Sequence, residues 1–257
     1  LPICLLLMTD YRGKVLCLFD VDGTLSKSRN KATPEMGELL KELRKRYTIG
    51  IVGGSDLSKQ AEQLGDGLVN DFDYVFSENG LVAFFNGEKI HSQSFKDHLG
   101  EENLKRFINW TLKRLSEMDC PQKRGNFIEF RTGMINVSVC GRNVNQAERD
   151  GYAAFDDEVK QRAGLVKDWQ EAFPELGLRY SIGGQISVDV FPEGWDKTYC
   201  LQHVASRNFE EIHFFGDKTH EGGNDYEIYN HPGTIGHAVT KPDDTMEILR
   251  KEFLARK

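Results

Sequence analysis

Two aspartates, Asp20 and Asp22, follow the uninterrupted apolar run of residues 15–19 and lead into Gly23-Thr24. Such a run is typical of a strand buried on both faces of a parallel sheet, and ligands bind beyond the carboxyl ends of these strands. If the backbone stays extended, positions i and i+2 face the same way, so both carboxylates face one ligand. Adjacent carboxylates repel each other unless a cation lies between them or one is protonated. The pair therefore predicts a hard divalent metal such as Mg²⁺, a carboxylate nucleophile and a carboxylic acid.

Three further motifs lie next to predicted strands and helices. Gly54-Ser55 places a hydroxyl and backbone N–H groups at a helix start, which suits phosphate oxygens. Lys197 lies at another helix start, where the helix dipole disfavours a cation, so a special role is indicated. Asp217 opens the acidic, glycine-rich segment 216–225, which is typical of a metal-binding loop. Each has an ordinary alternative, namely a turn, a surface lysine or a solvated loop, but their order along one chain favours a single site.

The segments around these motifs predict a parallel sheet. Strands are expected at residues 15–19, 47–52, 74–76 and 212–215, and helices at 33–46, 58–64 and 197–205. Thr33-Pro34 is typical of an N-cap followed by proline at the first helical position. Strands that alternate with helices imply parallel pairing.

The pattern changes between residues 90 and 194. An amphipathic helix is predicted over residues 101–118, and hairpins are predicted around Thr132-Gly133 and Gly183-Gly184. A helix from about residue 146 is expected between the hairpins, with Asn145 and Glu148 as its capping box. We therefore expect an α/β protein with a Rossmann-like core of residues 1–89 and 195–257 and an inserted α+β cap domain of residues 90–194.

Composition excludes several classes of function. The net charge of -7 and the pI near 5.6 argue against a nucleic-acid-binding footprint. The five cysteines are scattered without a C-x-x-C pair, so neither a disulfide framework nor a zinc site is indicated, and a cytoplasmic location is expected. Residues 1–7 are apolar but too short for a membrane span, no other membrane segment is predicted, and Met8 is interpreted as the natural initiator.

The predicted cap carries local positive charge. Residues 121–150 have a net charge of +2, with Arg131, Arg142 and Arg149 among their cations. Arginine binds phosphate in a bidentate manner, so these side chains suit a second, non-reacting phosphate. In the second hairpin Ser187 and Asp189 share a polar face that suits sugar hydroxyls, although an ordinary solvated face is the alternative.

Residues 19–24 resemble the nucleophile motif of the haloacid dehalogenase superfamily, and the superfamily's four motifs fall on Asp20 with Asp22, Ser55, Lys197 and Asp217. Longer segments narrow the resemblance to the eukaryotic phosphomannomutases. The similar segments are residues 19–25, 52–56, 78–83, 123–125, 127–131, 181–185, 195–197 and 214–218. The fold implied is a haloacid dehalogenase-like core with a cap.

This resemblance implies an isomerase that interconverts mannose 6-phosphate and mannose 1-phosphate through an aspartyl phosphate. It also implies Mg²⁺, a hexose 1,6-bisphosphate primer and intermediate, a cytoplasmic role in supplying GDP-mannose for glycosylation, and a homodimer formed through the cap. The preference between mannose and glucose phosphates stays open, so phosphoglucomutase activity is an allowed addition.

The resemblance also assigns site residues. Asp20 is the implied nucleophile, Asp22 the general acid and base, and Ser55 and Lys197 the groups that stabilise the phosphoryl charge. The metal falls on Asp20, Asp22 (through its main-chain carbonyl) and Asp217. Substrate contacts fall on Arg29, Arg131, Arg142, Arg149, Ser187 and Asp189. A second cation falls on Tyr229, His231 and Thr234, where the family has Asp at the position of His231.

Two other functions remain to be weighed. A sugar-phosphate phosphatase would use the same core with water as the acceptor, but it needs only one phosphate site, and the arginine-rich cap counts against it. A non-catalytic sugar-phosphate-binding protein is the other alternative, and the presence of both Asp20 and Asp22 counts against that.

Overall fold

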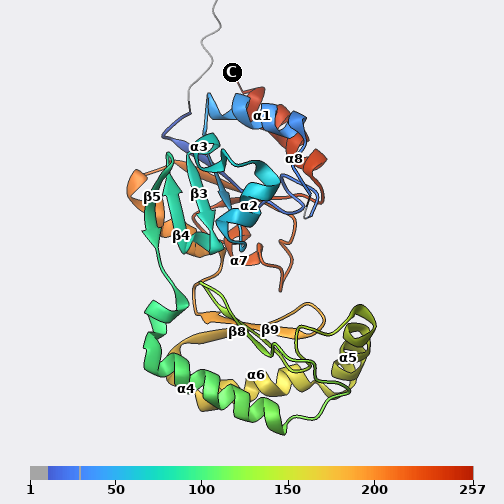
Figure 1. The fold of residues 1–257 in the computed structure, drawn as a ribbon. Coiled ribbons are helices and arrows are strands. Elements are labelled where there is room, and N and C mark those ends of the chain that lie inside the picture. The colour runs from blue at the N-terminus through green and yellow to red at the C-terminus, as the bar shows by residue number, and fades with distance from the viewer. Residues whose placement is uncertain (1–10, 29, 257) are drawn as a thin grey trace, which may run out of the picture. The chain divides into compact units, whose positions relative to one another are not determined.

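The computed structural model describes residues 11–28 and 30–256, and the chain divides into two compact units (Figure 1). Unit 1 is formed by the described residues up to Ser92 together with those from Asp196 onward, and unit 2 is Gln93–Trp195. Arg29, predicted to contact substrate, and residues 1–7, whose origin the sequence analysis questioned, lie outside the described residues.

Unit 1 is built around a mixed sheet. Its described strands are, in spatial order, β11 (Ile235–Ala238), β10 (Glu211–Gly216), β1 (Val15–Phe19), β2 (Thr48–Val52), β3 (Tyr74–Ser77), β4 (Val82–Phe85) and β5 (Glu88–Ser92). Pairing is parallel from β11 to β3 and antiparallel from β3 to β5. The helices are α1 (Pro34–Arg44), α2 (Leu57–Leu64), α3 (Leu68–Asp71), α7 (Tyr226–Tyr229) and α8 (Pro242–Ile248), with 3₁₀ helices η1 (Glu78–Gly80), η3 (Lys197–His203) and η4 (Ala205–Arg207) and a π-helical turn η5 (Leu249–Leu254).

The central strand β1 is buried on both faces, as its apolar run predicts. Cys17 and Phe19 belong to one hydrophobic cluster with the α1 side chains Met36, Leu39, Leu40 and Leu43, whose i, i+3, i+4, i+7 spacing is that of one helix face. Leu16 and Leu18 belong to the cluster on the other face. Alternate residues of a strand point to opposite faces, so only a run without polar positions can serve both clusters.

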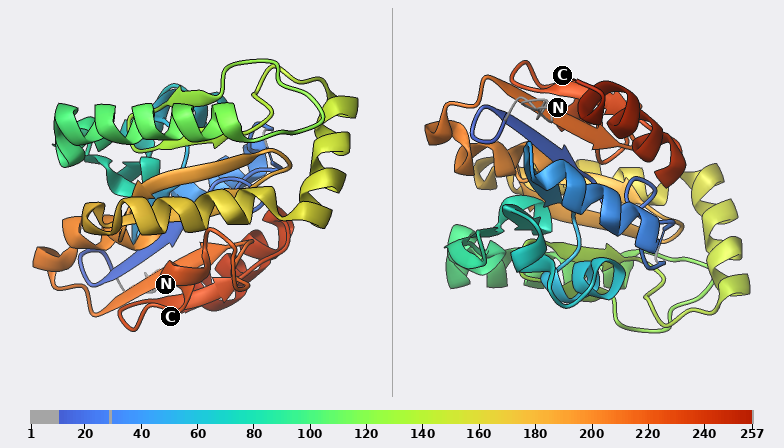
Figure 2. Two further views of the ribbon diagram at one scale, coloured as in Figure 1. Left: turned by 90° about the horizontal axis from the view of Figure 1, so that it is seen from below. Right: turned by 90° about the horizontal axis from the view of Figure 1, so that it is seen from above.

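Unit 2 combines an antiparallel sheet with helices. The sheet has the order β6 (Ile128–Phe130), β7 (Ile135–Ser138), β9 (Ser187–Pro192) and β8 (Leu178–Gly183), and the helices are α4 (Phe95–Glu117), α5 (Gln146–Val159) and α6 (Gln161–Ala172), followed by the 3₁₀ helix η2 (Pro174–Leu176). Helices α4 and α6 run side by side (Figure 2), and the buried Trp169 of α6 donates to Thr111 of α4 at 2.9 Å. Trp169 also stacks on Tyr180 of β8, so α6 packs against the sheet as well as against α4.

The predicted α/β class with a parallel core sheet and a separate antiparallel sheet is confirmed. Both predicted hairpins form, Thr33 caps α1 by accepting from Met36 N, and both hydrogen bonds of the Asn145–Glu148 capping box are present. No helix in the described part of the chain is long and apolar enough to cross a membrane.

Several elements differ from expectation. Strands β4, β5 and β11 were not predicted, because most of their residues are exposed or half-buried and the sequence shows no apolar alternation there. Helices α3, α6, α7 and α8 were not predicted either. The helix expected over residues 197–205 is instead η3 and η4. Lys197 and Cys200 are both buried, and the three-residue turn of a 3₁₀ helix places positions i and i+3 on one side.

Candidate active site

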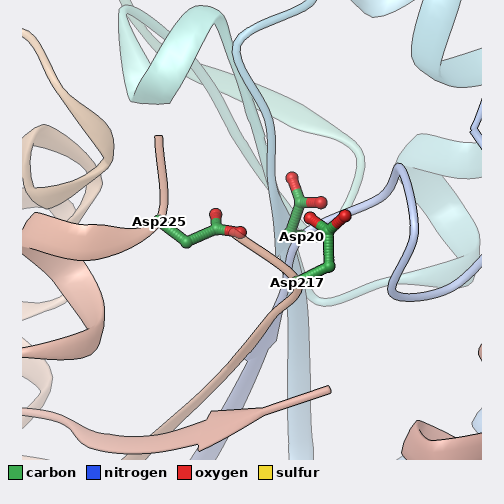
Figure 3. A group of neighbouring side chains, drawn as sticks. All are labelled: Asp20, Asp217 and Asp225. Carbon is green, nitrogen blue, oxygen red and sulfur yellow. The ribbon is translucent and has the colours of Figure 1, made fainter. Parts of the chain in front are cut away.

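Three aspartates of unit 1 lie close together beyond the carboxyl ends of β1 and β10, with one oxygen of each within 4.8 Å of the others (Figure 3). Asp20 follows β1, Asp217 follows β10, and Asp225 immediately precedes α7. The parallel register pairs Phe19 with Phe215, and the main-chain N–H of Asp20 donates to the Phe215 carbonyl at 2.9 Å. Strand pairing therefore brings together aspartates that are almost two hundred positions apart in the sequence.

The ammonium of Lys197 lies among these carboxylates. Its Nζ donates to Asp20 Oδ1 and to Asp225 Oδ1, the latter at 2.5 Å, and the side chain is 1% exposed. Burial by itself lowers the pKa of Lys197, but the carboxylates of Asp20 and Asp225 more than offset it, and the pKa lies above its ordinary value. Lys197 is therefore a buried cation and not a surface lysine.

The cluster is short of positive charge. In the described part of the chain the three carboxylates share one hydrogen-bonded ammonium, that of Lys197, and the charge of Lys218 acts on Asp217 in addition. Negative charge therefore still exceeds positive charge. Burial raises the pKa of Asp20 to about 6; Lys197 opposes this shift and Asp225 adds to it. Burial also raises the pKa of Asp217, and among the described residues its buried Oδ1 has no hydrogen-bond donor. Clustered hard oxygen ligands with an orphaned oxygen fit a divalent cation such as Mg²⁺.

Gly23 allows Asp217 to approach the loop after β1. Its φ is +79°, and a Cβ at this position would lie 2.3 Å from Asp217 Oδ2. Any other residue would be strained by the backbone and would displace the carboxylate. The glycine of the Asp-x-Asp-Gly-Thr motif therefore has a steric role in the acidic cluster.

The second motif aspartate points elsewhere. Asp22 Oδ1 accepts a hydrogen bond from Gln63 Nε2 at 2.8 Å, and its carboxylate does not belong to the cluster of Asp20, Asp217 and Asp225. Asp20 and Asp22 were expected to face one ligand, and both line one cavity, but only Asp20 belongs to the acidic cluster. The resemblance assigns the main-chain carbonyl of Asp22 to the metal, and proton transfer by its side chain stays a prediction.

A cavity of about 120 Å³ joins the predicted groups of the core. Its lining residues are Asp20, Val21, Asp22, Gly53, Gly54, Ser55, Gln60, Gln63, Lys218 and Asn224. Ser55 lies just before α2, whose N-cap Asp56 accepts from Lys59 N at 2.9 Å. Two carboxylates, a hydroxyl and a helix N-terminus thus surround one space, an arrangement that suits a phosphoryl group.

Sequence reasoning missed several residues of this site. Asp225 belonged to the acidic segment 216–225, so its carboxylate was a signal that could have been used. Gln63, Lys218 and Asn224 carried no such signal, because a helical glutamine or a loop lysine is common on any protein surface.

The residues predicted for a second cation lie at the end of α7, which Tyr229 closes, and in the turn that follows it. Thr234 Oγ1 donates to the carbonyls of Ile228 at 2.5 Å and His231 at 3.0 Å, and Gly233 N donates to His231 Nδ1 at 3.1 Å. The turn that follows Tyr229 and contains His231 and Thr234 is therefore closed by local hydrogen bonds.

In unit 2 the predicted substrate residues form a polar network on one row of the sheet. Glu129 pairs with Asn136 across β6 and β7, and Asn136 pairs with Asp189 across β7 and β9. Glu129 Oε2 accepts from Arg131 Nη2 at 2.9 Å and from Arg142 Nε at 2.8 Å. Asn136 accepts from Arg142 Nη1 at 2.5 Å and donates to Asp189 Oδ1 at 2.6 Å. The two guanidinium groups are therefore held close together.

Arg149 and Ser187 flank this network. Arg149 Nη2 donates to the main-chain carbonyl of Arg142 at 3.0 Å, and Ser187 at the start of β9 pairs with Ser138 of β7. The apolar residues Val188 and Val190 of β9 are fully buried, and Asp189 between them is only half-buried, as the predicted alternation requires. Glu129 and Asn136, which orient these side chains, were not predicted as site residues.

Comparison with known proteins gives a consistent result. The profile of the family described as eukaryotic phosphomannomutase matches residues 36–255. A phosphomannomutase from Arabidopsis thaliana is 58% identical over 241 residues, which cover 94% of this chain and 97% of that protein. A phosphomannomutase from Schizosaccharomyces pombe is 56% identical over 243 residues, covering 93% and 95%. The solved structure of an Aspergillus fumigatus trehalose-6-phosphate phosphatase has a TM-score of 0.58 at 15% identity, covering 92% and 91%, and shares the haloacid dehalogenase-like fold.

Proposed function

Since the chain belongs to the eukaryotic phosphomannomutase family of isomerases, we propose that it interconverts mannose 6-phosphate and mannose 1-phosphate through an aspartyl phosphate and a hexose 1,6-bisphosphate. The observation that carries the proposal is the position of Lys197. A buried ammonium that contacts Asp20 and Asp225 offsets the repulsion between an anionic nucleophile and an anionic phosphate.

The core residues would carry two opposite transfers. A carboxylate oxygen of Asp20 bonds to phosphorus as the bond between phosphorus and the sugar oxygen breaks, and Asp22 in its acid form protonates that leaving oxygen. On return, Asp22 takes the proton from the other sugar hydroxyl as that oxygen attacks phosphorus, and the Asp20 carboxylate is released. Ser55 and the N–H groups at the start of α2 would bind the non-bridging phosphate oxygens.

Asp20, Asp217 and the main-chain carbonyl of Asp22 would hold Mg²⁺ at this site, next to the pair of Asp225 and Lys197. A metal bound there would supply Lewis-acid stabilisation of the phosphoryl charge. A second cation would be held by Tyr229 at the end of α7 and by His231 and Thr234 of the following turn, in which Thr234 Oγ1 already donates to two main-chain carbonyls.

A mutase must also hold the phosphate that is not reacting, and we assign this role to unit 2. Arg131, Arg142 and Arg149 would bind that phosphate, with Arg29 as a further contact, and Ser187 and Asp189 would bind sugar hydroxyls. The support is pre-organisation, because Glu129 and Asn136 hold the Arg142 guanidinium in place before a ligand arrives. A phosphatase would have no use for this second set of cations.

Arg142→Ala is expected to raise the KM for mannose 1-phosphate by roughly 10- to 100-fold, the effect of losing charge-assisted hydrogen bonds to phosphate. The melting temperature should change little, because the side chain is 30% exposed and its partner Glu129 keeps Arg131. Steady-state kinetics and a thermal melt measure both quantities. Arg106→Ala, which removes an exposed guanidinium paired with Glu175, serves as the matched control. A fall in melting temperature with an unchanged KM would instead assign Arg142 a structural role.

The wider role is part of the same proposal. In the cytoplasm the protein would supply mannose 1-phosphate for the synthesis of GDP-mannose, which is used in glycosylation. Phosphoglucomutase activity would use the same two phosphate sites. A homodimer through unit 2 is consistent with the exposed apolar side chains of this unit, which are Leu112, Phe130, Val159 and Ile182.

³¹P NMR of mannose 1-phosphate with the protein, Mg²⁺ and a trace of glucose 1,6-bisphosphate tests the proposal. Build-up of the 6-phosphate signal, which depends on the bisphosphate, is the expected result. Growth of inorganic phosphate alone would identify a phosphatase, and the absence of any new signal from folded protein would contradict both activities.

A further inference from the structure

The amide of Gln63 connects helix α2 to Asp22. Gln63 Nε2 donates to Asp22 Oδ1 at 2.8 Å and lies 3.3 Å from Ser26 Oγ, which it also approaches as a donor. Gln63 is half-buried and lines the same cavity as Asp20, Asp22 and Ser55. It therefore lies beside the proposed proton-transfer group without belonging to the acidic cluster.

Helix α2 is held in place by a second glutamine. Gln60 is 1% exposed, donates from Nε2 to the Phe76 carbonyl at 3.2 Å and accepts from Ser77 Oγ at 2.7 Å, so it anchors the helix to β3. Positions i and i+3 lie on the same face of a helix, so Gln63 is presented from an anchored surface. A Cβ at Gly53 would lie 2.9 Å from Gln60 Nε2, which confirms that this contact is tight.

The side-chain amide of Gln63 contacts both ends of the loop that carries Asp22, at Asp22 and at Ser26. Asp22 forms an isolated bridge with Ser26, and Gly23 N donates to the Ser26 carbonyl at 2.7 Å. Ser26 is buried, and its Oγ accepts from Gln63. The main-chain carbonyl of Gln63 also accepts from Ala32 N at 2.9 Å, which ties the chain beyond this loop to α2.

We propose that Gln63 is a positioning residue that holds Asp22 in the orientation required for proton transfer, an inference that rests on the acid–base role of Asp22 proposed above. A mutase must deliver protons to two different sugar oxygens with one carboxyl group, so an off-target rotamer reduces both transfers. An amide N–H needs a lone pair on Oδ1 and therefore favours the proton on Oδ2. The amide is also uncharged, so it orients Asp22 without adding a further charge to a site that already contains several carboxylates and the Lys197 ammonium.

The decisive experiment is a double-mutant cycle. Gln63→Met keeps the length and volume of the side chain and removes the donor. It is expected to lower kcat by roughly 10- to 100-fold, the effect of losing one hydrogen bond to a charged group, with the KM for mannose 1-phosphate unchanged. In the Asp22→Asn background, the quantity measured is the single-turnover rate at which the bisphosphate phosphorylates Asp20. Adding Gln63→Met should change this rate by less than about threefold.

A second measurement separates positioning from damage to the fold. Beryllium trifluoride with Mg²⁺ mimics the phosphoryl group on Asp20 and needs no proton transfer, so ¹⁹F NMR should detect equal binding by the wild type and by Gln63→Met. The exposed neighbour on α2 gives the matched control, Glu62→Met, which should retain wild-type kcat.

Each outcome has a distinct meaning. Equal effects of Gln63→Met in both backgrounds would overturn the inference, since Gln63 would then act independently of Asp22, and so would loss of beryllium trifluoride binding. An Asp22→Asn variant with unreduced rate would instead overturn the acid–base role of Asp22 and, with it, the proposed function.

Discussion

Asp20→Asn is expected to lower turnover by at least about 10,000-fold, because a carboxamide cannot form the covalent bond to phosphorus on which both transfers depend. The protein should stay folded. The carboxamide keeps an oxygen that accepts from Lys197, and the substitution removes one of three carboxylates from a cluster that contains a single ammonium. The melting temperature measured without Mg²⁺ should therefore be equal to or higher than that of the wild type.

The measurement pairs turnover by ³¹P NMR with mass spectrometry of the protein after incubation with glucose 1,6-bisphosphate. The wild type should gain the mass of one phosphoryl group on the peptide that contains Asp20, and the variant should gain none. Glu62→Met provides a control for substitution in unit 1, because its side chain is exposed on α2. Substantial turnover by Asp20→Asn, or phosphorylation on another peptide, would refute the assignment of the nucleophile.

Lys197→Met is expected to damage both activity and stability, unlike the substitution of Asp20. It leaves Asp20 and Asp225 buried without the ammonium that contacts both. Breaking a buried ion pair from one side costs about 3–5 kcal/mol, which corresponds to roughly 6–20 °C in melting temperature for a protein of this size. Turnover should fall by at least about 100-fold, since no ammonium offsets the charge that develops on the phosphoryl group.

The stability loss should depend on pH in a definite direction. Burial already raises the pKa of Asp20 to about 6, and without Lys197 the pKa rises further. A carboxyl group whose pKa is higher in the folded state stabilises folding at low pH and loses that contribution as pH rises through the folded pKa. The difference in melting temperature between the variant and the wild type should therefore be larger at about pH 8 than at about pH 5.

Thermal melts at the two pH values test this prediction, with Lys59→Met as the control, because Lys59 is 63% exposed and forms its ion pair with the N-cap Asp56 at the surface. A Lys197→Met variant as stable as the wild type would show that the buried ammonium does not compensate the two carboxylates. A loss of stability that is larger at the acidic pH would contradict the linkage.

The local elements of this protein follow from short stretches of sequence. The apolar run before Asp20 predicts a central strand, Thr33-Pro34 predicts the start of α1, and Asn145 with Glu148 predicts a capping box, all of which form. These features were predictable because burial on one or both faces, and the hydrogen bonds of helix ends, depend on residues only a few positions apart. Strands β5 and β11 were missed because they lie at the sheet edges, where exposed strands require no apolar pattern.

Short sequence motifs specify the types of chemical group and the strand ends on which they lie, namely two carboxylates after one strand, a hydroxyl before a helix and an acidic loop after a later strand. Which of these groups meet depends on the three-dimensional fold. Lys197 contacts Asp20 across 177 positions of the chain, and the amide of Gln63 reaches Asp22 across 41. Such pairs depend on the register of parallel strands and on how a helix is anchored, and no spacing along the chain encodes either. The charge balance of the site, and therefore its demand for a cation, is for that reason a property of the fold.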